Sequence, residues 1–183
     1  MRSPFPLLPK CRLSNTIKSQ NIYGEPVLNI ITGKINSGKT AYMRSLYEKS
    51  PYGDGVLSVK HYNAESFCGY DLHHLKSGKE MAFIRLIEKL PAGWDSCAGM
   101  EKFSFSGQGL QFAERIFRSI NEGPVYIDEI GPLEIIKKKG FYPILQELLK
   151  SKKNIYLTVR EEMINNFISA FSIREQITVT TIQ

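Results

Sequence analysis

The run Gly33-Lys34-Ile35-Asn36-Ser37-Gly38-Lys39-Thr40 constrains the fold of this chain more than any other segment. It matches the phosphate-loop pattern G-x-x-x-x-G-K-[ST] in full. A mostly apolar, β-branched run precedes it at residues 27–32, and a helical pattern follows at residues 40–49. A glycine loop between a buried strand and a helix is the usual setting for binding phosphate groups. The segment therefore predicts an α/β fold built around a phosphate-binding loop.

The residue types in this loop suit the several negative charges of a triphosphate. Backbone N–H groups and the positive end of the following helix hold phosphates without water. Gly33 and Gly38 allow the turn and the close approach of the backbone to the ligand. Lys39 reaches the β- and γ-phosphates, and the Thr40 hydroxyl ligates magnesium. We therefore predict a nucleotide site made of Gly33, Lys34, Ile35, Asn36, Ser37, Gly38, Lys39 and Thr40, with Lys39 also acting in catalysis.

A second segment with candidate site residues lies at residues 125–129, where the apolar strand Val-Tyr-Ile is followed by two acidic residues, Asp128 and Glu129. In phosphate-loop proteins an Asp in this position holds magnesium, which assigns Asp128 as a metal ligand beside Thr40. Side chains alternate along a strand, so Glu129 is expected to point the opposite way. There it would face the γ-phosphate and take a proton from the attacking water.

Arg160 follows a strand predicted at residues 154–159. In a parallel sheet its guanidinium would lie at the same edge as the phosphates, where it would stabilise charge on the γ-phosphate. A surface salt bridge is the alternative. Arg85 and Arg115 are weaker candidates for this role.

Strands predicted at residues 27–32, 55–60, 125–127, 154–159 and 176–181 alternate with helical segments. This alternation favours a parallel sheet covered by helices on both faces. Alternating apolar residues around a Ser-Gly turn predict an antiparallel hairpin insert at about residues 62–90, and residues 91–107 are expected to be a loop. The proline-rich, basic segment 1–25 is expected to be a flexible arm before a domain over residues 26–183.

Composition excludes several classes of protein. The 183 residues suit one soluble domain, and no apolar run is long enough to span a membrane. Three widely spaced cysteines, Cys11, Cys68 and Cys97, argue against a disulfide framework or a zinc site. The net charge is +6, but the basic residues do not form a cluster with aromatic residues of the kind that binds nucleic acid. We expect a cytoplasmic protein, and the sequence identifies no protein partner.

The stretch Val-Tyr-Ile-Asp-Glu-Ile-Gly-Pro-Leu-Glu at residues 125–134, together with the phosphate loop, resembles the THEP-type nucleoside-triphosphatases. Residues 69–72, 75–78 and 84–85 resemble the hairpin of that family. The resemblance implies magnesium-dependent hydrolysis of ATP, GTP and other triphosphates to diphosphates, with loose base selectivity. It also implies a RecA-like, mostly parallel five-stranded sheet of order 5-1-4-3-2, in which the strand ending at Val159 separates the two site strands.

The sequence departs from this family at three places. The segment 1–25 precedes the usual start, Lys60 stands near a position that is commonly acidic, and residues 91–105 match poorly. Two other functions stay open at this stage: a nucleoside or nucleotide kinase, and a non-catalytic nucleotide switch. A single arginine, Arg85, in the insert disfavours a kinase lid, and Glu129 disfavours a pure switch.

Overall fold

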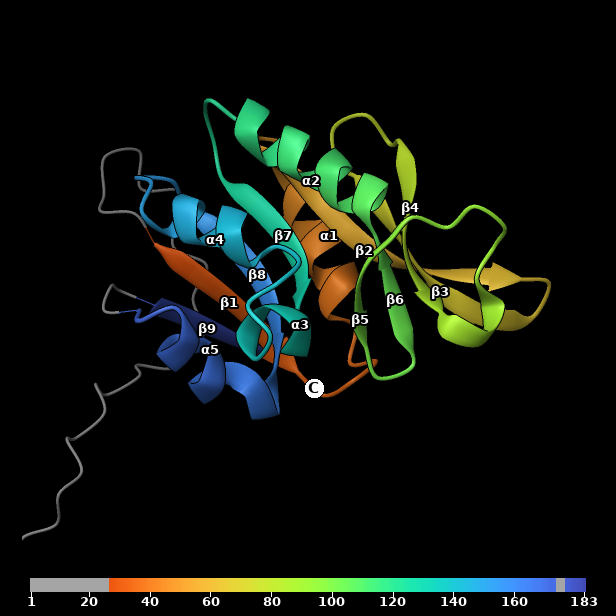
Figure 1. Ribbon diagram of the computed structural model, residues 1–183. Helices are drawn as coiled ribbons and strands as arrows, with labels where there is room; N and C mark the ends of the chain where they lie inside the picture. The colour runs from red at the N-terminus through yellow and green to blue at the C-terminus, as the bar shows by residue number, and fades with distance from the viewer. Residues whose placement is uncertain (1–26, 174–176) are drawn as a thin grey trace, which may run out of the picture.

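A computed structural model describes residues 27–173 and 177–183, and in this part of the chain nine strands form one sheet. The strand order is β5-β6-β4-β3-β2-β7-β8-β1-β9 (Figure 1). Five of these strands are parallel: β1 (Leu28–Gly33), β2 (Asp54–Asn63), β7 (Val125–Ile130), β8 (Ile155–Arg160) and β9 (Ile177–Ile182). Their relative order agrees with the expected one, and β8 lies between β1 and β7.

The expected count of five strands is wrong, whereas the antiparallel hairpin expected at about residues 62–90 is present as two strands of the same sheet. Four antiparallel strands continue the same sheet beyond β2, namely β3 (Ser66–His74), β4 (Glu80–Leu86), β6 (Phe103–Ser106) and β5 (Ser96–Met100). The hairpin joins the sheet because β2 runs on to Asn63 and pairs with β3 from Val56 to its end. The expected loop at residues 91–107 contains the β5–β6 hairpin, after a short 3-10 helix, η1 (Ile87–Lys89).

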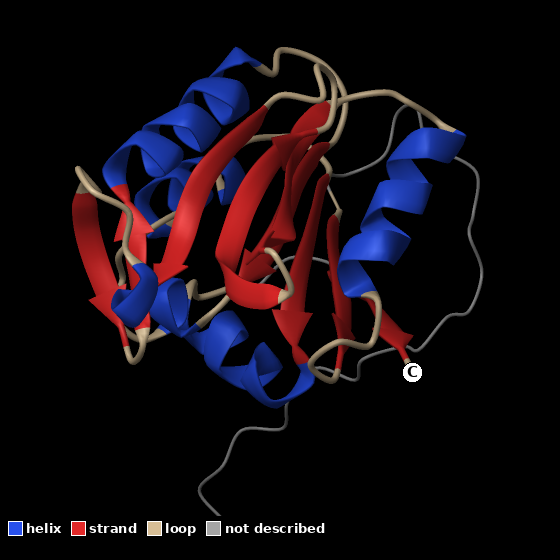
Figure 2. Cartoon of the chain, turned by 90° about the vertical axis from the view of Figure 1, so that its right-hand side faces the viewer, coloured by secondary structure: helices blue, strands red, loops and turns tan. Residues whose placement is uncertain are grey.

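Helices cover both faces of the sheet, as expected (Figures 1 and 2). Among the described residues, α1 (Lys39–Lys49) alone covers one face, where Met43 packs against Ile31, Leu57 and Tyr126. The opposite face carries the remaining helices: α2 (Gly107–Ser119), α3 (Pro132–Ile135), α4 (Tyr142–Leu149), and η2 (Glu161–Met163) continuing into α5 (Ile164–Ala170). Pro143 lies in the first turn of α4, where its missing N–H costs nothing.

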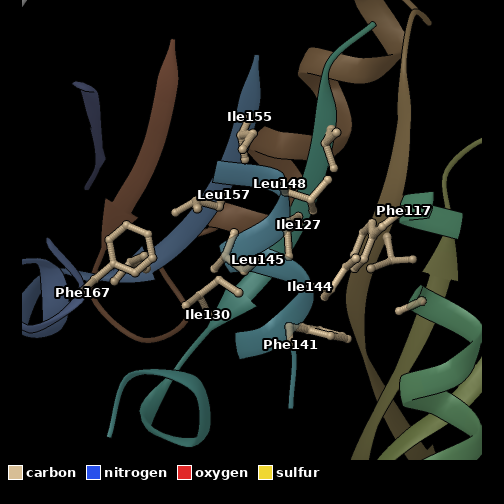
Figure 3. Packing of buried hydrophobic residues seen from close by; sticks show 14 of the residues in the cluster. Phe117, Ile127, Ile130, Phe141, Ile144, Leu145, Leu148, Ile155, Leu157 and Phe167 are labelled. Carbon is tan, nitrogen blue, oxygen red and sulfur yellow. The ribbon is translucent and has the colours of Figure 1, made fainter. Parts of the chain in front are cut away.

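The larger hydrophobic core lies between the sheet and α2, α4 and α5 (Figure 3). Phe117 of α2, Phe141 before α4 and Phe167 of α5 are its largest fully buried side chains. The Phe141 ring stacks on the Phe83 ring of β4, with 5.1 Å between the ring centroids. It packs edge-on against the Phe117 ring, with 5.7 Å between the centroids. These contacts hold the segment after β7 against the sheet, and β7 carries the two predicted acidic residues.

The carboxyl ends of the parallel strands lie at one edge of the sheet, where ligands bind in α/β folds. Gly33 at the end of β1 is the register partner of Arg160 at the end of β8. Strand β7 pairs with β2 only as far as Val56, so the rest of β2 extends past that edge. The predictions made for residues 1–25, and for Gln176 at the start of the last strand, lie outside the described residues.

Candidate active site

The phosphate loop closes tightly between β1 and α1. Gly38 is the residue directly before the first turn of α1. Its φ of +94° is a backbone conformation that residues with a side chain rarely adopt, which explains the glycine. Gly33 is required for a different reason, because a Cβ there would lie 2.3 Å from the carbonyl oxygen of Ile182. The Tyr42 N–H donates to the Gly38 carbonyl at 2.9 Å, which starts the helix. The N–H groups of the loop and first turn therefore gather at the positive end of α1.

The Lys39 side chain folds back over this loop. Its ammonium donates to the carbonyl oxygens of Gly33 at 3.0 Å and Lys34 at 2.7 Å. Burial lowers the pKa of Lys39, and the nearby Glu129 and Asp128 carboxylates oppose that effect. The charge of Lys39 therefore lies on the loop, within the electrostatic field of both acidic residues.

Asp128 is buried and joined to three elements. Its Oδ2 accepts hydrogen bonds from the Thr40 hydroxyl at 2.7 Å and the Ser58 N–H at 3.0 Å, and its Oδ1 accepts from the Thr158 hydroxyl at 2.7 Å. Burial raises the pKa of this carboxyl, and the donors, led by Thr158 and Thr40, hold it down. Sequence reasoning missed Ser58 and Thr158, although both occupy neighbouring strands close to the edge where Asp128 was predicted.

Glu129 does not follow simple strand alternation. Its φ of +64° is left-handed, and the β7–β8 register shifts between Ile127 and Ile130. The Thr158 hydroxyl accepts a hydrogen bond from the Glu129 N–H at 2.6 Å, which holds this irregular turn of the chain. The prediction that Glu129 points opposite to Asp128 rested on a regular strand, and the bulge removes that basis.

The Glu129 side chain is one-third exposed, and its pKa is raised by burial first and by Asp128 second. Arg160 and Lys39 oppose that rise. The Arg160 guanidinium lies 3.7 Å from Glu129 Oε1, an ion pair without a short hydrogen bond. The structure therefore brings Lys39, Thr40, Asp128, Glu129 and Arg160 together at one edge of the sheet.

The two weaker arginine candidates lie elsewhere. Arg85 is buried and donates to Asp71 Oδ1 at 2.6 Å and to the carbonyl oxygens of Tyr70 and Ile84. Arg115 lines a hollow between α2 and the β3–β4 turn, together with His74 and Met81. Neither guanidinium is placed with Lys39 and Glu129.

The residues at this edge fit a magnesium ion. Thr40 and Asp128 offer hard oxygen atoms 2.7 Å apart, and magnesium in nucleotide sites takes one or two carboxylates together with substrate phosphates. The buried Ser37 hydroxyl in the loop has no hydrogen-bond partner within the described residues, which leaves it available to a ligand. No group of three His, Cys, Asp or Glu side chains in residues 27–173 and 177–183 forms a separate metal cluster.

Glu134 is a further carboxylate that sequence reasoning left without a role. It is buried, and its oxygens accept hydrogen bonds from the N–H groups of Gly131 at 3.1 Å and Phe141 at 3.2 Å. Burial raises its pKa to about 7. It thus closes the turn that directly follows Glu129. The spacing of Glu134 from Gly131 and Pro132, which is typical of a helix cap, is the signal that could have found it.

Comparisons with known proteins agree with this architecture. A family described as NTPase matches residues 29–183. The fold resembles the solution structure of a human cancer-related nucleoside triphosphatase, with a TM-score of 0.63, 18% identity, and coverage of 87% of this chain and 89% of that one. It also resembles THEP1 from the hyperthermophile Aquifex aeolicus, with a TM-score of 0.59, 17% identity, and coverage of 85% and 90%. The comparison with curated protein sequences gave no significant match.

Proposed function

Since this chain belongs to the NTPase family, we propose that it hydrolyses nucleoside triphosphates to diphosphate and phosphate in a magnesium-dependent reaction at the edge formed by β1, β7 and β8. One observation carries the proposal. The phosphate loop, an oxygen pair suited to magnesium and a partly exposed carboxylate beside an arginine all lie at that edge. A binding site alone would need only the first two of these features.

Binding rests on the loop and its lysine. Backbone N–H groups of residues 33–40 surround the phosphates, and Lys39 exchanges its loop carbonyl partners for phosphate oxygens. Thr40 and Asp128 hold the magnesium ion, which when bound neutralises charge on the phosphate oxygens. Asp128 is fixed for this role because Ser58 and Thr158 also donate to it.

Hydrolysis rests on Glu129 and Arg160. Glu129 accepts a proton from water as the water oxygen attacks the γ-phosphorus and the bond to the β–γ bridging oxygen breaks. The raised pKa of Glu129 makes it a better proton acceptor than an exposed carboxylate. Arg160, already 3.7 Å from Glu129, stabilises the charge that develops on the γ-phosphate.

The residues proposed for binding and hydrolysis all contact the phosphate end of the nucleotide. We therefore propose that the protein accepts nucleoside triphosphates with different bases. Within the described residues, no helix is both long and apolar enough to cross a membrane. We propose a cytoplasmic location and no nucleic-acid partner, because the modest positive charge of the chain is not gathered into a basic site with aromatic residues.

The experiment is to measure phosphate release from ATP, GTP, CTP and UTP with and without magnesium. We expect release from all four without any acceptor, and none after chelation. Lys39→Ala should abolish binding and turnover, whereas Lys49→Ala, at the exposed end of the same helix, should leave both unchanged. Phosphate found only on an added nucleoside would replace hydrolysis by phosphoryl transfer to that acceptor.

A further inference from the structure

A histidine on β2 lies beyond the end of α1 that carries the phosphate loop. The Ser58 N–H of β2 and the Thr40 hydroxyl of α1 both donate to Asp128 Oδ2, at 3.0 Å and 2.7 Å, so the first turn of α1 lies beside β2 at Ser58. Strand β2 continues to Asn63 and projects past this level together with β3 (Figure 1). His61 lies about 10 Å farther along β2 than Ser58. It is therefore near the space in front of α1, where the loop binds phosphate groups.

The His61 side chain lies on the face of the sheet that α1 covers. Val59, two residues earlier on β2, packs on this face against the cluster that contains Met43 of α1. Side chains two residues apart on a strand share a face. The register shift between β2 and β3 comes only after His61, and Asp71, the β3 partner of Val59, contacts the His61 ring. The imidazole therefore projects from the same face as α1 and its phosphate loop.

One of the two nitrogens of the His61 ring is held by a carboxylate. Nδ1 lies 2.8 Å from Asp71 Oδ2, and Asp71 Oδ1 accepts a hydrogen bond from Arg85 at 2.6 Å. Arg85 is buried and also donates to the carbonyl oxygens of Tyr70 and Ile84, so the Asp71 carboxylate has a fixed position. A carboxylate on Nδ1 fixes the orientation of an imidazole and leaves Nε2 for a second partner.

The other nitrogen of the ring, Nε2, makes no hydrogen bond to any of the described residues. Strand β2 lies between β3 and β7, and Nδ1 points to Asp71 on β3. Because the two ring nitrogens point in nearly opposite directions, Nε2 points away from β3 and toward the β7 side, where Thr40 and Asp128 meet. The side chain of His61 is 38% exposed, so a bound ligand can reach this nitrogen.

We propose that His61 binds the substrate directly, by donating a hydrogen bond from Nε2–H to a γ-phosphate oxygen of the bound triphosphate. This inference rests on the proposed hydrolysis site. With Asp71 at one nitrogen and a phosphate at the other, the ring lies between two anions, which favours the form protonated on both nitrogens. Solvent supplies the additional proton when the nucleotide binds. The diphosphate product lacks the γ-phosphate and therefore loses this contact.

The test measures the affinity for ADP and for the β,γ-imido analogue of ATP, both with magnesium, in wild type, His61→Asn and His61→Gln. Loss of a hydrogen bond to a charged group should make His61→Asn bind the analogue roughly 10- to 100-fold more weakly and leave ADP affinity within about twofold of wild type. The glutamine amide N–H₂ reaches the position of Nε2, whereas the asparagine amide reaches only that of Nδ1. His61→Gln should therefore recover most of the analogue affinity, because it keeps a donor there.

The matched control is His73→Asn. His73 lies on the same face, and its Nδ1 is also next to a carboxylate, that of Glu80 at 3.3 Å, but it pairs with Leu57, before the first turn of α1 is reached. This variant should bind both nucleotides as wild type does. Unchanged analogue affinity in His61→Asn, an equal loss for ADP and the analogue, or no recovery in His61→Gln would each overturn the inference and leave hydrolysis intact. Absence of phosphate release from the wild type would overturn the proposed function and this inference together.

Discussion

The Thr40 hydroxyl donates to Asp128 Oδ2 at 2.7 Å and thereby joins the first turn of α1 to strand β7. Both residues are proposed magnesium ligands, so the contact sets the two donor atoms side by side before a nucleotide arrives. We expect Thr40→Val to lower magnesium-dependent phosphate release by roughly 10- to 100-fold, and Thr40→Ser to retain most of it. Titration of the rate with magnesium checks this, and equal rates for the two variants would contradict it.

Arg160 is expected to act in the transition state rather than in binding. Its guanidinium lies beside Glu129 and opposite Gly33, where charge on the γ-phosphate would develop. Arg160→Gln should lower kcat by roughly 1000-fold with little change in nucleotide affinity. Arg118→Gln, in an exposed pair with Glu147, is the control. A rise in the nucleotide dissociation constant with normal kcat would show that Arg160 only binds.

The buried Arg85–Asp71 pair is expected to stabilise the antiparallel half of the sheet. Arg85 is 8% exposed at its side chain and satisfies two carbonyl oxygens as well as Asp71. Arg85→Met should lower the free energy of unfolding by about 3–5 kcal/mol, because the mostly buried Asp71 carboxylate would lose its arginine and keep only the partly exposed His61 ring as a partner. Urea unfolding measures this. Arg118→Met should leave the free energy of unfolding unchanged, since its ion pair is exposed to solvent.

Glu134 predicts a pH dependence of stability. Its pKa is raised from 4.5 to about 7, so between these values the folded chain keeps a proton that the unfolded chain has lost. The free energy of unfolding should therefore fall as pH rises from about 4.5 to about 7, and this contribution should be constant above that range. Burial also raises the pKa values of Asp128 and Glu129, so wild type must be compared with a variant.

The comparison is wild type against Glu134→Gln, unfolded in urea at several pH values. The difference in the free energy of unfolding should change by on the order of 3 kcal/mol across this window. Glu122 is an exposed residue in the turn before β7, and the difference between wild type and Glu122→Gln should not change with pH. A difference between wild type and Glu134→Gln that is independent of pH would contradict the assignment.

Much of the central architecture could be predicted because local signals and global structure agree there. The apolar run before Gly33 and the helix after Thr40 leave one arrangement for the loop, and parallel strands bring Asp128 and Arg160 to its edge. The extent of the sheet could not be predicted. Strands β5 and β6 are only five and four residues long, and β5 carries small residues that do not favour a strand. Their strand character depends on pairing, because β6 pairs with β4 and β5 pairs with β6.

The details of the site escaped prediction for a related reason. Periodicity describes regular strands, whereas Glu129 sits in a left-handed bulge held by Thr158 from another strand. The donors to Asp128 from Ser58 and Thr158 likewise depend on the alignment of three strands. Contacts of this kind are set by strand register, which the sequence does not state locally.

The central claim is that Glu129 converts nucleotide binding into hydrolysis, and Glu129→Gln tests it most directly. Phosphate release and nucleotide affinity are measured for this variant and for Glu122→Gln, an exposed position in the turn that precedes the amino end of β7. The account predicts that Glu129→Gln retains nucleotide affinity and loses roughly 100- to 10,000-fold in turnover, while Glu122→Gln matches wild type. Near-normal turnover in Glu129→Gln would contradict it.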